Sequence, residues 1–235
     1  FFDNGPDEQQ ALLLLDEALA ELTMVRVRNE NGTVTVVIAS VAEIAGDDLE
    51  ARTDLLDQPV VIQERYQFSN SGTFQHFIPG STLAFRDMLV MMIVVSDNTA
   101  TGTIADMVGL ERVNDLCQSI GMRGTTHRHG IPLANTPRDH GVDDVNATTP
   151  ADVGLLLDLI VGGTTDAESA ARLGCTPELC RLAMDILSWQ KLAQRLPAHL
   201  PLGTKVAHKT GTGVLGRNNN DAGIIFQCDE PLYIL

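Results

Sequence analysis

Strand-like segments stand near both ends of the chain, and a long stretch of helical pattern separates them. These segments are residues 24–28, 33–38, 205–209, 222–226 and 232–235. The Asn31-Gly32 pair suits a hairpin turn between the first two, and a Gly/Asn-rich turn is expected at 213–221. Because a strand cannot bury its apolar face alone, these segments predict one shared antiparallel sheet with the helical stretch inserted between its parts.

This order predicts an α+β fold of the α/β sandwich type, in which helices flank an antiparallel sheet and a mainly helical lobe is inserted. Residues 1–46 together with 187–235 are expected to form the sheet lobe, and residues 47–186 the helical lobe, in one continuous structural unit. An amphipathic helix is expected over 8–22, where it can cover the sheet. Ligand sites favour such junctions, so we expect the functional residues at the seam between the lobes.

The charge balance excludes several classes of partner. The chain has 16 Lys and Arg against 31 Asp and Glu, which gives a formal net charge of -15. Such a chain repels nucleic acid and anionic membrane surfaces. No apolar stretch reaches the roughly 20 residues that a membrane-spanning helix needs. Nucleic acid and membrane surfaces are therefore not expected partners, a small-molecule substrate is compatible with this charge, and the composition leaves the oligomeric state open.

The cysteines and histidines do not predict a metal site or a cofactor. The four cysteines show no Cys-x-x-Cys pair and no histidine at zinc-finger spacing. Cys175 and Cys180 are near enough in sequence to form a small loop disulfide, although connectivity cannot be read from sequence. His127, His129 and His140 lie in one polar loop, but no helix fixes them on a common face.

A polar triplet, Ser96-Asp97-Asn98, directly follows the apolar run 88–95. Ser, Asp and Asn are favoured helix caps and turn formers, so one interpretation is that the triplet only separates two helices. The other interpretation is that it faces a ligand. The two roles are compatible.

A second motif, Lys209-Thr210-Gly211, follows at the end of a late strand. If the strand lies at an edge, the Lys209 ammonium can project into the seam, and Gly211 lets the backbone approach a ligand closely. A surface strand that ends in a turn would contain the same residues. By itself the triplet is weak evidence of function.

Together the two triplets resemble two of the three signature elements of the serine β-lactamases and penicillin-binding proteins. The resemblance to class A β-lactamase-like proteins extends in order over roughly residues 55–226, through LLDQPVVI, GTFQHFIPGSTLAFRDMLVMMIVVSDNTAT, VNDLC, GMRGTT, NATTPADVGLLLDLI, LPLGTKVAHKTG and NNNDAGIIF. It implies a β-lactamase/DD-peptidase-like fold and a secreted or periplasmic mature chain. A start on Phe1 suggests a processed or trimmed product, and the further strand and final helix that the family would add after Leu235 suggest a fragment.

The resemblance implies roles for the residues of both motifs. Ser96 would relay a proton to the leaving nitrogen, Asp97 would brace the loop, and Lys209 would hold the substrate carboxylate and sharpen the proton-donating power of Ser96. The backbone N–H of Thr212 would form half of the oxyanion hole. The implied substrate-binding residues are Asn98, Thr210, Gly211 and Thr212.

The third signature element, a nucleophile in a Ser-x-x-Lys motif, is degenerate here. Ser40 is the serine in the comparable place and the implied nucleophile, but the lysine position holds Glu43, and no lysine precedes Lys191. A carboxylate can accept the serine proton but repels the tetrahedral oxyanion, so slow acylation is expected. The alternative is that Ser40 is an ordinary small residue at a strand end. The formal motif Ser188 to Lys191 stands in the wrong order and is expected on a packing helix.

The glutamate that usually activates water for deacylation is missing as well. Proficient class A enzymes activate water with a loop glutamate, and residues 121–150 contain no Glu. The residues that could replace it as a base are Asp139, Asp143, Asp144, His127, His129 and His140. Their alternative is to be solvated side chains of a polar loop.

Three functions remain open at this point. The first is a serine hydrolase that acts through an acyl-enzyme on a β-lactam or a related amide or ester, with low turnover. The second is a catalytically degenerate homologue that binds peptidoglycan-like peptides or β-lactams. The third is a D-Ala-D-Ala peptidase or esterase, which the missing loop glutamate favours.

Overall fold

The structure is a computed structural model, and it describes residues 56–235 apart from 69–70, 132–140 and 213–218. The predicted helix at 8–22 and the two predicted N-terminal strands lie outside the described residues, as does Ser40. The lobe boundaries therefore stay a prediction.

A small two-stranded sheet precedes the helices. Its strands β1 (Pro59–Val61) and β2 (Thr82–Ala84) pair antiparallel, with Val60 opposite Leu83. Two short 3-10 helices, η2 (Glu64–Tyr66) and η3 (Phe74–His76), lie in the connection between these strands. This connection runs back to the start of α4, where it contributes to the candidate site.

The helical part follows in chain order. Its elements are α3 (Phe85–Val94), α4 (Asn98–Val108), α5 (Leu110–Ile120), η4 (Val142–Asp144), α6 (Pro150–Gly163), α7 (Ala167–Arg172), α8 (Pro177–Ser188) and η5 (Leu196–His199). Polar caps begin several of them: the side chain of Thr149 accepts from the backbone of Asp152 at the start of α6, and Thr176 does the same at the start of α8. Each cap residue is followed by a proline, the residue best suited to the first helical position.

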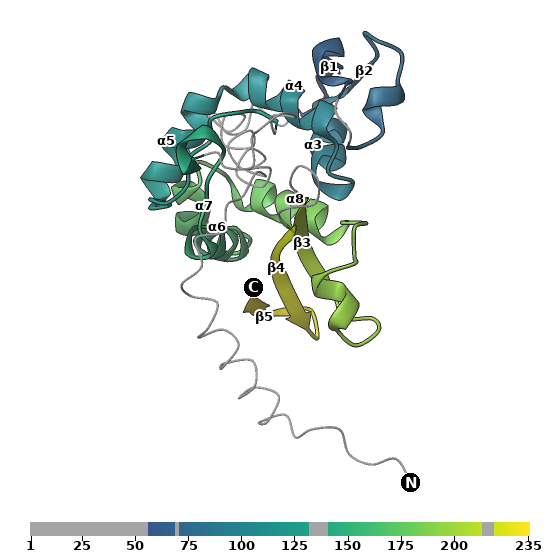
Figure 1. Cartoon of the computed structure of the whole chain (residues 1–235). Helices are drawn as coiled ribbons and strands as arrows, with labels where there is room; N and C mark the ends of the chain where they lie inside the picture. Colours follow the sequence, from purple (N-terminus) through teal and green to yellow (C-terminus); the bar gives the residue numbers. More distant parts are fainter. Residues whose placement is uncertain (1–55, 69–70, 132–140, 213–218) are drawn as a thin grey trace.

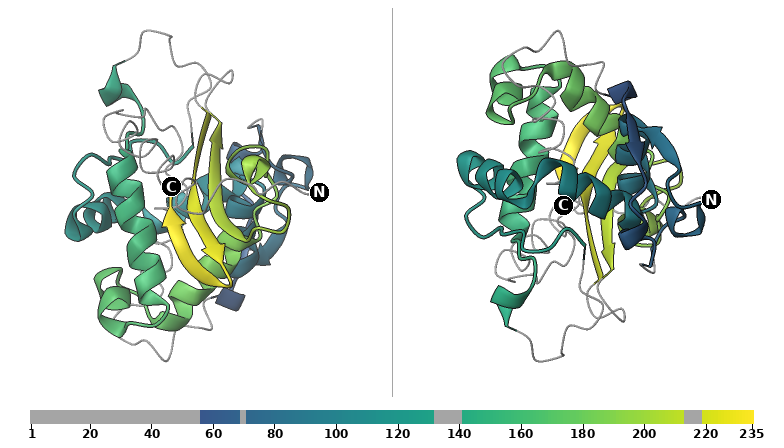
Figure 2. Two further views of the ribbon diagram at one scale, coloured as in Figure 1. Left: turned by 90° about the horizontal axis from the view of Figure 1, so that it is seen from below. Right: turned by 90° about the horizontal axis from the view of Figure 1, so that it is seen from above.

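A three-stranded antiparallel sheet closes the described chain (Figure 1). Its strands are β3 (Val206–Thr212), β4 (Asn219–Gln227) and β5 (Glu230–Ile234), in the order β3-β4-β5. Helix α8 packs against β3, and α6 runs along one side of the sheet in both views of Figure 2. Both strands of the β3-β4 pair extend beyond the predicted bounds, because Thr210, Gly211 and Thr212 pair with residues that were predicted to form a turn.

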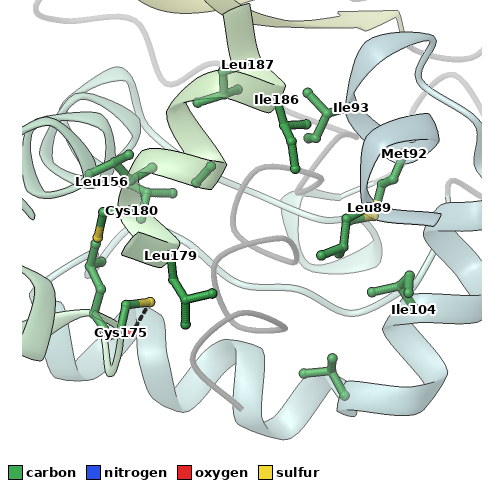
Figure 3. Packing of buried hydrophobic residues seen from close by; sticks show 14 of the residues in the cluster. Leu89, Met92, Ile93, Ile104, Leu156, Cys175, Leu179, Cys180, Ile186 and Leu187 are labelled. Carbon is green, nitrogen blue, oxygen red and sulfur yellow. Dashed lines mark hydrogen bonds between the residues drawn. The ribbon is translucent and has the colours of Figure 1, made fainter. Parts of the chain in front are cut away.

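The hydrophobic core lies between α3, α4, α6 and α8 (Figure 3). Its largest fully buried side chains include Met88, Leu89, Met92, Ile104, Leu156 and Ile160. Ile93 of α3 and Ile186 and Leu187 of α8 belong to the same cluster. This packing fixes the C-terminal ends of α3 and α8 relative to each other, and the loop that follows α3 carries Ser96. Helices around a small antiparallel sheet confirm the predicted α+β class.

Candidate active site

Ser96 lies in the tight loop between α3 and α4. Its φ is 55°, in the left-handed region that non-glycine residues seldom adopt. Two hydrogen bonds hold this loop: the backbone N–H of Asp97 donates to the carbonyl of Met91 at 3.1 Å, and the hydroxyl of Ser71 donates to the carbonyl of Ser96 at 2.8 Å. Such backbone outliers persist where surrounding contacts fix them, and they cluster at functional sites.

Asp97 is the fully buried N-cap of α4 and braces this loop, as expected from the resemblance. One carboxylate oxygen accepts the backbone N–H of Ala100 at 3.0 Å. The other accepts the backbone N–H groups of Thr73 at 2.6 Å and Phe74 at 2.8 Å. Gly72 (φ 91°) permits this approach, because a Cβ there would lie 2.1 Å from the carboxylate. The carboxylate thus joins the start of α4 to the η3 segment.

Lys209 reaches this loop from β3. Its side chain is buried, and its Nζ donates a hydrogen bond to Ser96 Oγ at 2.9 Å and another to the carbonyl of Thr210. The two residues are 113 positions apart in the chain. The predicted convergence of the two motifs is therefore confirmed.

The surroundings of Lys209 weaken its hold on a proton. The pKa of Lys209 is lowered from 10.5 to about 7, mainly by burial; the negative charge of Asp221 opposes this shift, and the positive charge of Arg195 adds to it. At neutral pH a large share of the amine is therefore unprotonated. An amine in that state can accept a proton from the hydroxyl that it contacts.

Arg195 lies beside the end of β3 and was missed in the sequence analysis. Its Nη1 donates to the carbonyls of Gly211 at 2.7 Å and Asn220 at 2.5 Å. Its Nη2 donates to Thr212 Oγ1 at 2.6 Å and to Asn219 Oδ1 at 3.0 Å. A second cation thus stands next to the Lys-Thr-Gly segment. No motif marks this residue, because only the fold of the segment before β3 brings it there.

Asp221 of β4 connects the segment that carries Arg195 with strand β3. Its carboxylate contacts His208 Nδ1 at 2.9 and 3.1 Å and accepts the backbone N–H of Leu196 at 3.0 Å. The side chains of Asp221 and His208 are 5% and 2% exposed. This buried pair anchors the Arg195 segment to β3 and β4, and so fixes the distance between the two cations.

The other predicted binding residues lie on the same two elements. Asn98 is the first residue of α4 and half-buried, and its backbone N–H donates to the carbonyl of Ser71 at 3.2 Å. Thr210 and Gly211 are buried on β3, and Thr212 is exposed at its end. The structure thus brings the described motif residues to one place, while Ser40 lies outside the described residues.

The loop residues proposed as a base mostly have structural partners. Asp143 pairs with Arg128 at 3.1 Å, and Asp144 accepts the backbone N–H of Gly141 at 2.8 Å. His129 Nε2 lies 3.0 Å from the carbonyl oxygen of Asp144. Asp139 and His140 lie outside the described residues.

His127 is buried rather than solvated. Its ring nitrogens have no hydrogen-bond partner among the described residues, and burial lowers the pKa of its imidazole to about 4. A neutral imidazole at physiological pH is therefore expected at this position. Its burial reflects packing, which favours a structural role over that of a base in contact with solvent.

Ser188 occupies the last turn of α8, and its hydroxyl donates to the carbonyl of Met184 at 2.9 Å. The helix ends there, so Lys191 lies beyond it, where its backbone N–H donates to the carbonyl of Val94. This formal Ser-x-x-Lys motif therefore serves packing.

Within the described ranges, no three His, Cys, Asp or Glu side chains gather closely enough to hold a metal ion. In the same part of the chain, no helix has the length and apolar character needed to cross a membrane.

The sequence and the fold were compared with known proteins. The model of the beta-lactamase enzyme family matches residues 36–235. No curated protein matches the sequence. Several hundred solved chains do match, and three of them are described here.

The three solved structures have similar folds and modest identity. A β-lactamase from Sphaerobacter thermophilus DSM 20745 is 24% identical, with a TM-score of 0.68, covering 86% of this chain and 71% of that one. A PBP-A mutant, in an acyl-enzyme complex with penicillin G, is 26% identical, with a TM-score of 0.66 and coverage of 88% and 70%. A β-lactamase from Desulfarculus baarsii DSM 2075 is 20% identical, with a TM-score of 0.72 and coverage of 97% and 86%.

Proposed function

The chain belongs to the beta-lactamase enzyme family, and from this premise we propose that it is a serine hydrolase acting through an acyl-enzyme on a β-lactam or a related amide or ester, with low turnover. The contact that carries the proposal is the 2.9 Å hydrogen bond between Lys209 Nζ and Ser96 Oγ. Acyl transfer needs a group that moves a proton between the attacking hydroxyl and the leaving nitrogen. A hydroxyl bonded to an amine of lowered pKa meets that need.

Lys209 is the lysine best placed for this role. The chain has three lysines in all, at positions 191, 205 and 209. Lys205 is half exposed and pairs with Asp229 at 3.1 Å, and Lys191 follows α8. The Ser-x-x-Lys lysine of the family is replaced by Glu43, so we assign proton transfer to the Ser96-Lys209 pair. In acylation Ser96 gives its proton to the leaving nitrogen and recovers one through Lys209.

Arg195 and the protonated share of Lys209 near the end of β3 suit a substrate carboxylate. Lys209 and Arg195 flank the Thr210 to Thr212 segment, and Arg195 already bonds to Thr212 Oγ1. Cationic side chains and hydroxyls are the groups that bind a carboxylate most strongly. In a chain with a net charge of -15, this local positive charge gives an anionic substrate a defined place to bind.

The nucleophile in this proposal is Ser40, as the resemblance implies. Glu43, which stands where the motif has its lysine, would oppose the negative charge of the tetrahedral intermediate, so acylation is expected to be slow. Of the loop carboxylates, Asp143 and Asp144 already have structural partners. Hydrolysis of the acyl-enzyme is therefore expected to be slow as well, which is consistent with low turnover.

A second candidate function is that of a penicillin-binding protein that stays acylated, including a D-Ala-D-Ala peptidase or esterase. Two observations favour it: residues 121–150 hold no glutamate, and one of the similar structures is a PBP-A mutant in an acyl-enzyme complex with penicillin G. A secreted or periplasmic location would accompany either function.

The decisive experiment combines turnover with trapping. The wild type and the variants Ser96→Ala and Ser40→Ala are assayed for hydrolysis of nitrocefin and for covalent labelling by a fluorescent penicillin, with Ser188→Ala as the matched control. Turnover supports the hydrolase, and labelling of Ser40 without turnover supports the penicillin-binding protein. If neither signal appears and a β-lactam only raises the melting temperature, the protein is a binder and the proposal is wrong.

A further inference from the structure

The turn between α7 and α8 holds Cys175 in a fixed position. Helix α7 ends in a Schellman motif: the backbone N–H of Cys175 donates to the carbonyl of Ala170 at 3.0 Å, and that of Gly174 donates to Ala171 at 2.9 Å. Gly174 has the left-handed φ of 65° that this motif requires. Cys175 therefore ends one helix immediately before Thr176 caps the next.

The start of α8 places a second cysteine against the first. Thr176 is the N-cap of α8, so Cys175 occupies the position before the cap, and Cys180 lies four residues after the cap. Side chains at these two positions pack on each other in the hydrophobic staple found at many helix starts. Figure 3 shows both cysteines at this end of α8. The sequence spacing and the cap geometry thus agree on a thiol-thiol contact.

Both thiols are free and buried in the structure. The Cys175 thiol donates to the carbonyl of Leu173 at 3.4 Å. The interaction with Cys180, together with burial, raises the pKa of the Cys175 thiol. Both neighbours of Cys175 in the chain are less buried than Cys175 itself, so the pair lies just beneath the surface of the turn.

We propose that Cys175 and Cys180 form a redox-responsive pair that a small-molecule disulfide converts to an intrachain disulfide across the start of α8. One protein thiolate attacks a sulfur of the small disulfide, forming a mixed disulfide and releasing one thiol. The second protein thiolate attacks the mixed disulfide, forming the Cys175–Cys180 bond and releasing a second thiol. Two protein thiols are oxidised and one small disulfide is reduced to two thiols.

The bond would act on the scaffold of the candidate site. At its other end, α8 leads to Gln190, whose Nε2 donates to the carbonyl of Ile93 at 2.8 Å, and to Lys191, whose backbone N–H donates to Val94 at 3.0 Å. These two carbonyls belong to the end of α3, directly before Ser96. A covalent staple at the start of α8 would therefore steady the helix that supports the Ser96 loop. The inference does not depend on the proposed function.

The test counts thiols in the folded full chain. Reduced protein is equilibrated with mixtures of oxidised and reduced glutathione, quenched with acid and alkylated under denaturing conditions. We expect two alkylated thiols to be lost to a crosslinked peptide that joins residues 175 and 180, in addition to any glutathione adduct at the exposed Cys228. The same equilibration in urea gives the reference, and we expect the folded chain to favour this bond about tenfold or more over the unfolded one, since the fold holds the thiols together.

The matched controls are the other two cysteines. A variant with Cys117→Ser and Cys228→Ser should still lose both remaining thiols. Cys175→Ala and Cys180→Ala should each keep a free thiol or a glutathione adduct at the surviving partner. If the wild type keeps four alkylated thiols, or forms the bond no more readily when folded than in urea, the inference is wrong.

Discussion

Replacing Lys209 by methionine should make the protein more stable at neutral pH, because burying the amine of Lys209 lowers the free energy of unfolding. The pKa of Lys209 falls from 10.5 to about 7 because the side chain is buried. Each factor of ten in a protonation equilibrium is worth about 1.4 kcal/mol, so the cost is about 5 kcal/mol at pH 7 and below. Methionine has a similar length and has no charge to desolvate.

Part of this gain is offset by lost hydrogen bonds. Lys209 donates to the half-buried Ser96 Oγ, which water can still reach, and to the carbonyl of the buried Thr210; the one buried acceptor left without its donor costs about 1 to 3 kcal/mol. The expected net gain for Lys209→Met is about 2 to 4 kcal/mol at pH 7. Substitutions at active sites commonly stabilise a protein and reduce its activity, because the charged groups that they remove serve the chemistry and not the stability of the fold.

The pH dependence provides the sharper test. Between pH 7 and 10.5 the unfolded lysine is protonated and the folded one is neutral, so the unfolded state binds more protons and wild-type stability rises with pH. The advantage of the methionine variant should therefore shrink by about 1.4 kcal/mol for each pH unit between pH 7 and 9.

The free energy of unfolding is measured by urea titration, followed by circular dichroism, at pH 7, 8 and 9. Lys205→Met is the matched control, since Lys205 is half exposed and pairs with Asp229, and its difference from the wild type should not change with pH. A Lys209→Met difference that is constant from pH 7 to 9 would refute the claim that the folded protein holds this amine with a lowered pKa.

Three further predictions concern the site. Lys209→Arg keeps the charge but removes the proton acceptor, so penicillin labelling should slow by roughly 10²-fold or more, and the wild-type labelling rate should rise as the pH passes through about 7; a variant that labels at the wild-type rate contradicts this. Arg195→Gln should raise KM for a carboxylate-bearing β-lactam about tenfold with little change in kcat, as measured by steady-state kinetics, and an unchanged KM would exclude Arg195 from substrate binding. Asp97→Ala should lower the free energy of unfolding by about 3 kcal/mol or more, because three backbone N–H groups, two of them in buried hydrogen bonds, lose their acceptor; urea titration against the exposed Asp87→Ala checks it, and equal stability of the two variants would contradict it.

Local sequence patterns predicted much of the fold. The apolar run 88–95 and the Ser96-Asp97-Asn98 triplet marked the boundary between two helices, because caps and helical spacing depend on a few neighbouring residues. The order of segments predicted the α+β class, and the two triplets indicated a serine β-lactamase-like protein; that the chain belongs to the beta-lactamase enzyme family is confirmed. The predicted end of β3 was wrong, since strand bounds depend on cross-strand pairing with β4.

Only the tertiary structure decided how the site works. Ser96 Oγ and Lys209 Nζ lie 2.9 Å apart, although 113 positions separate the two residues in the chain. They meet because α3 packs against α8 and β3 lies against α8. Arg195 carries no local signal, and its place beside Thr212 depends on the anchoring of its segment by Asp221. The sequence by itself determined which chemical groups the protein has, because those groups are the side chains. The distances between these side chains and the lowered pKa of Lys209 result from burial and from the meeting of segments that are far apart in the chain. Both depend on the whole packed fold.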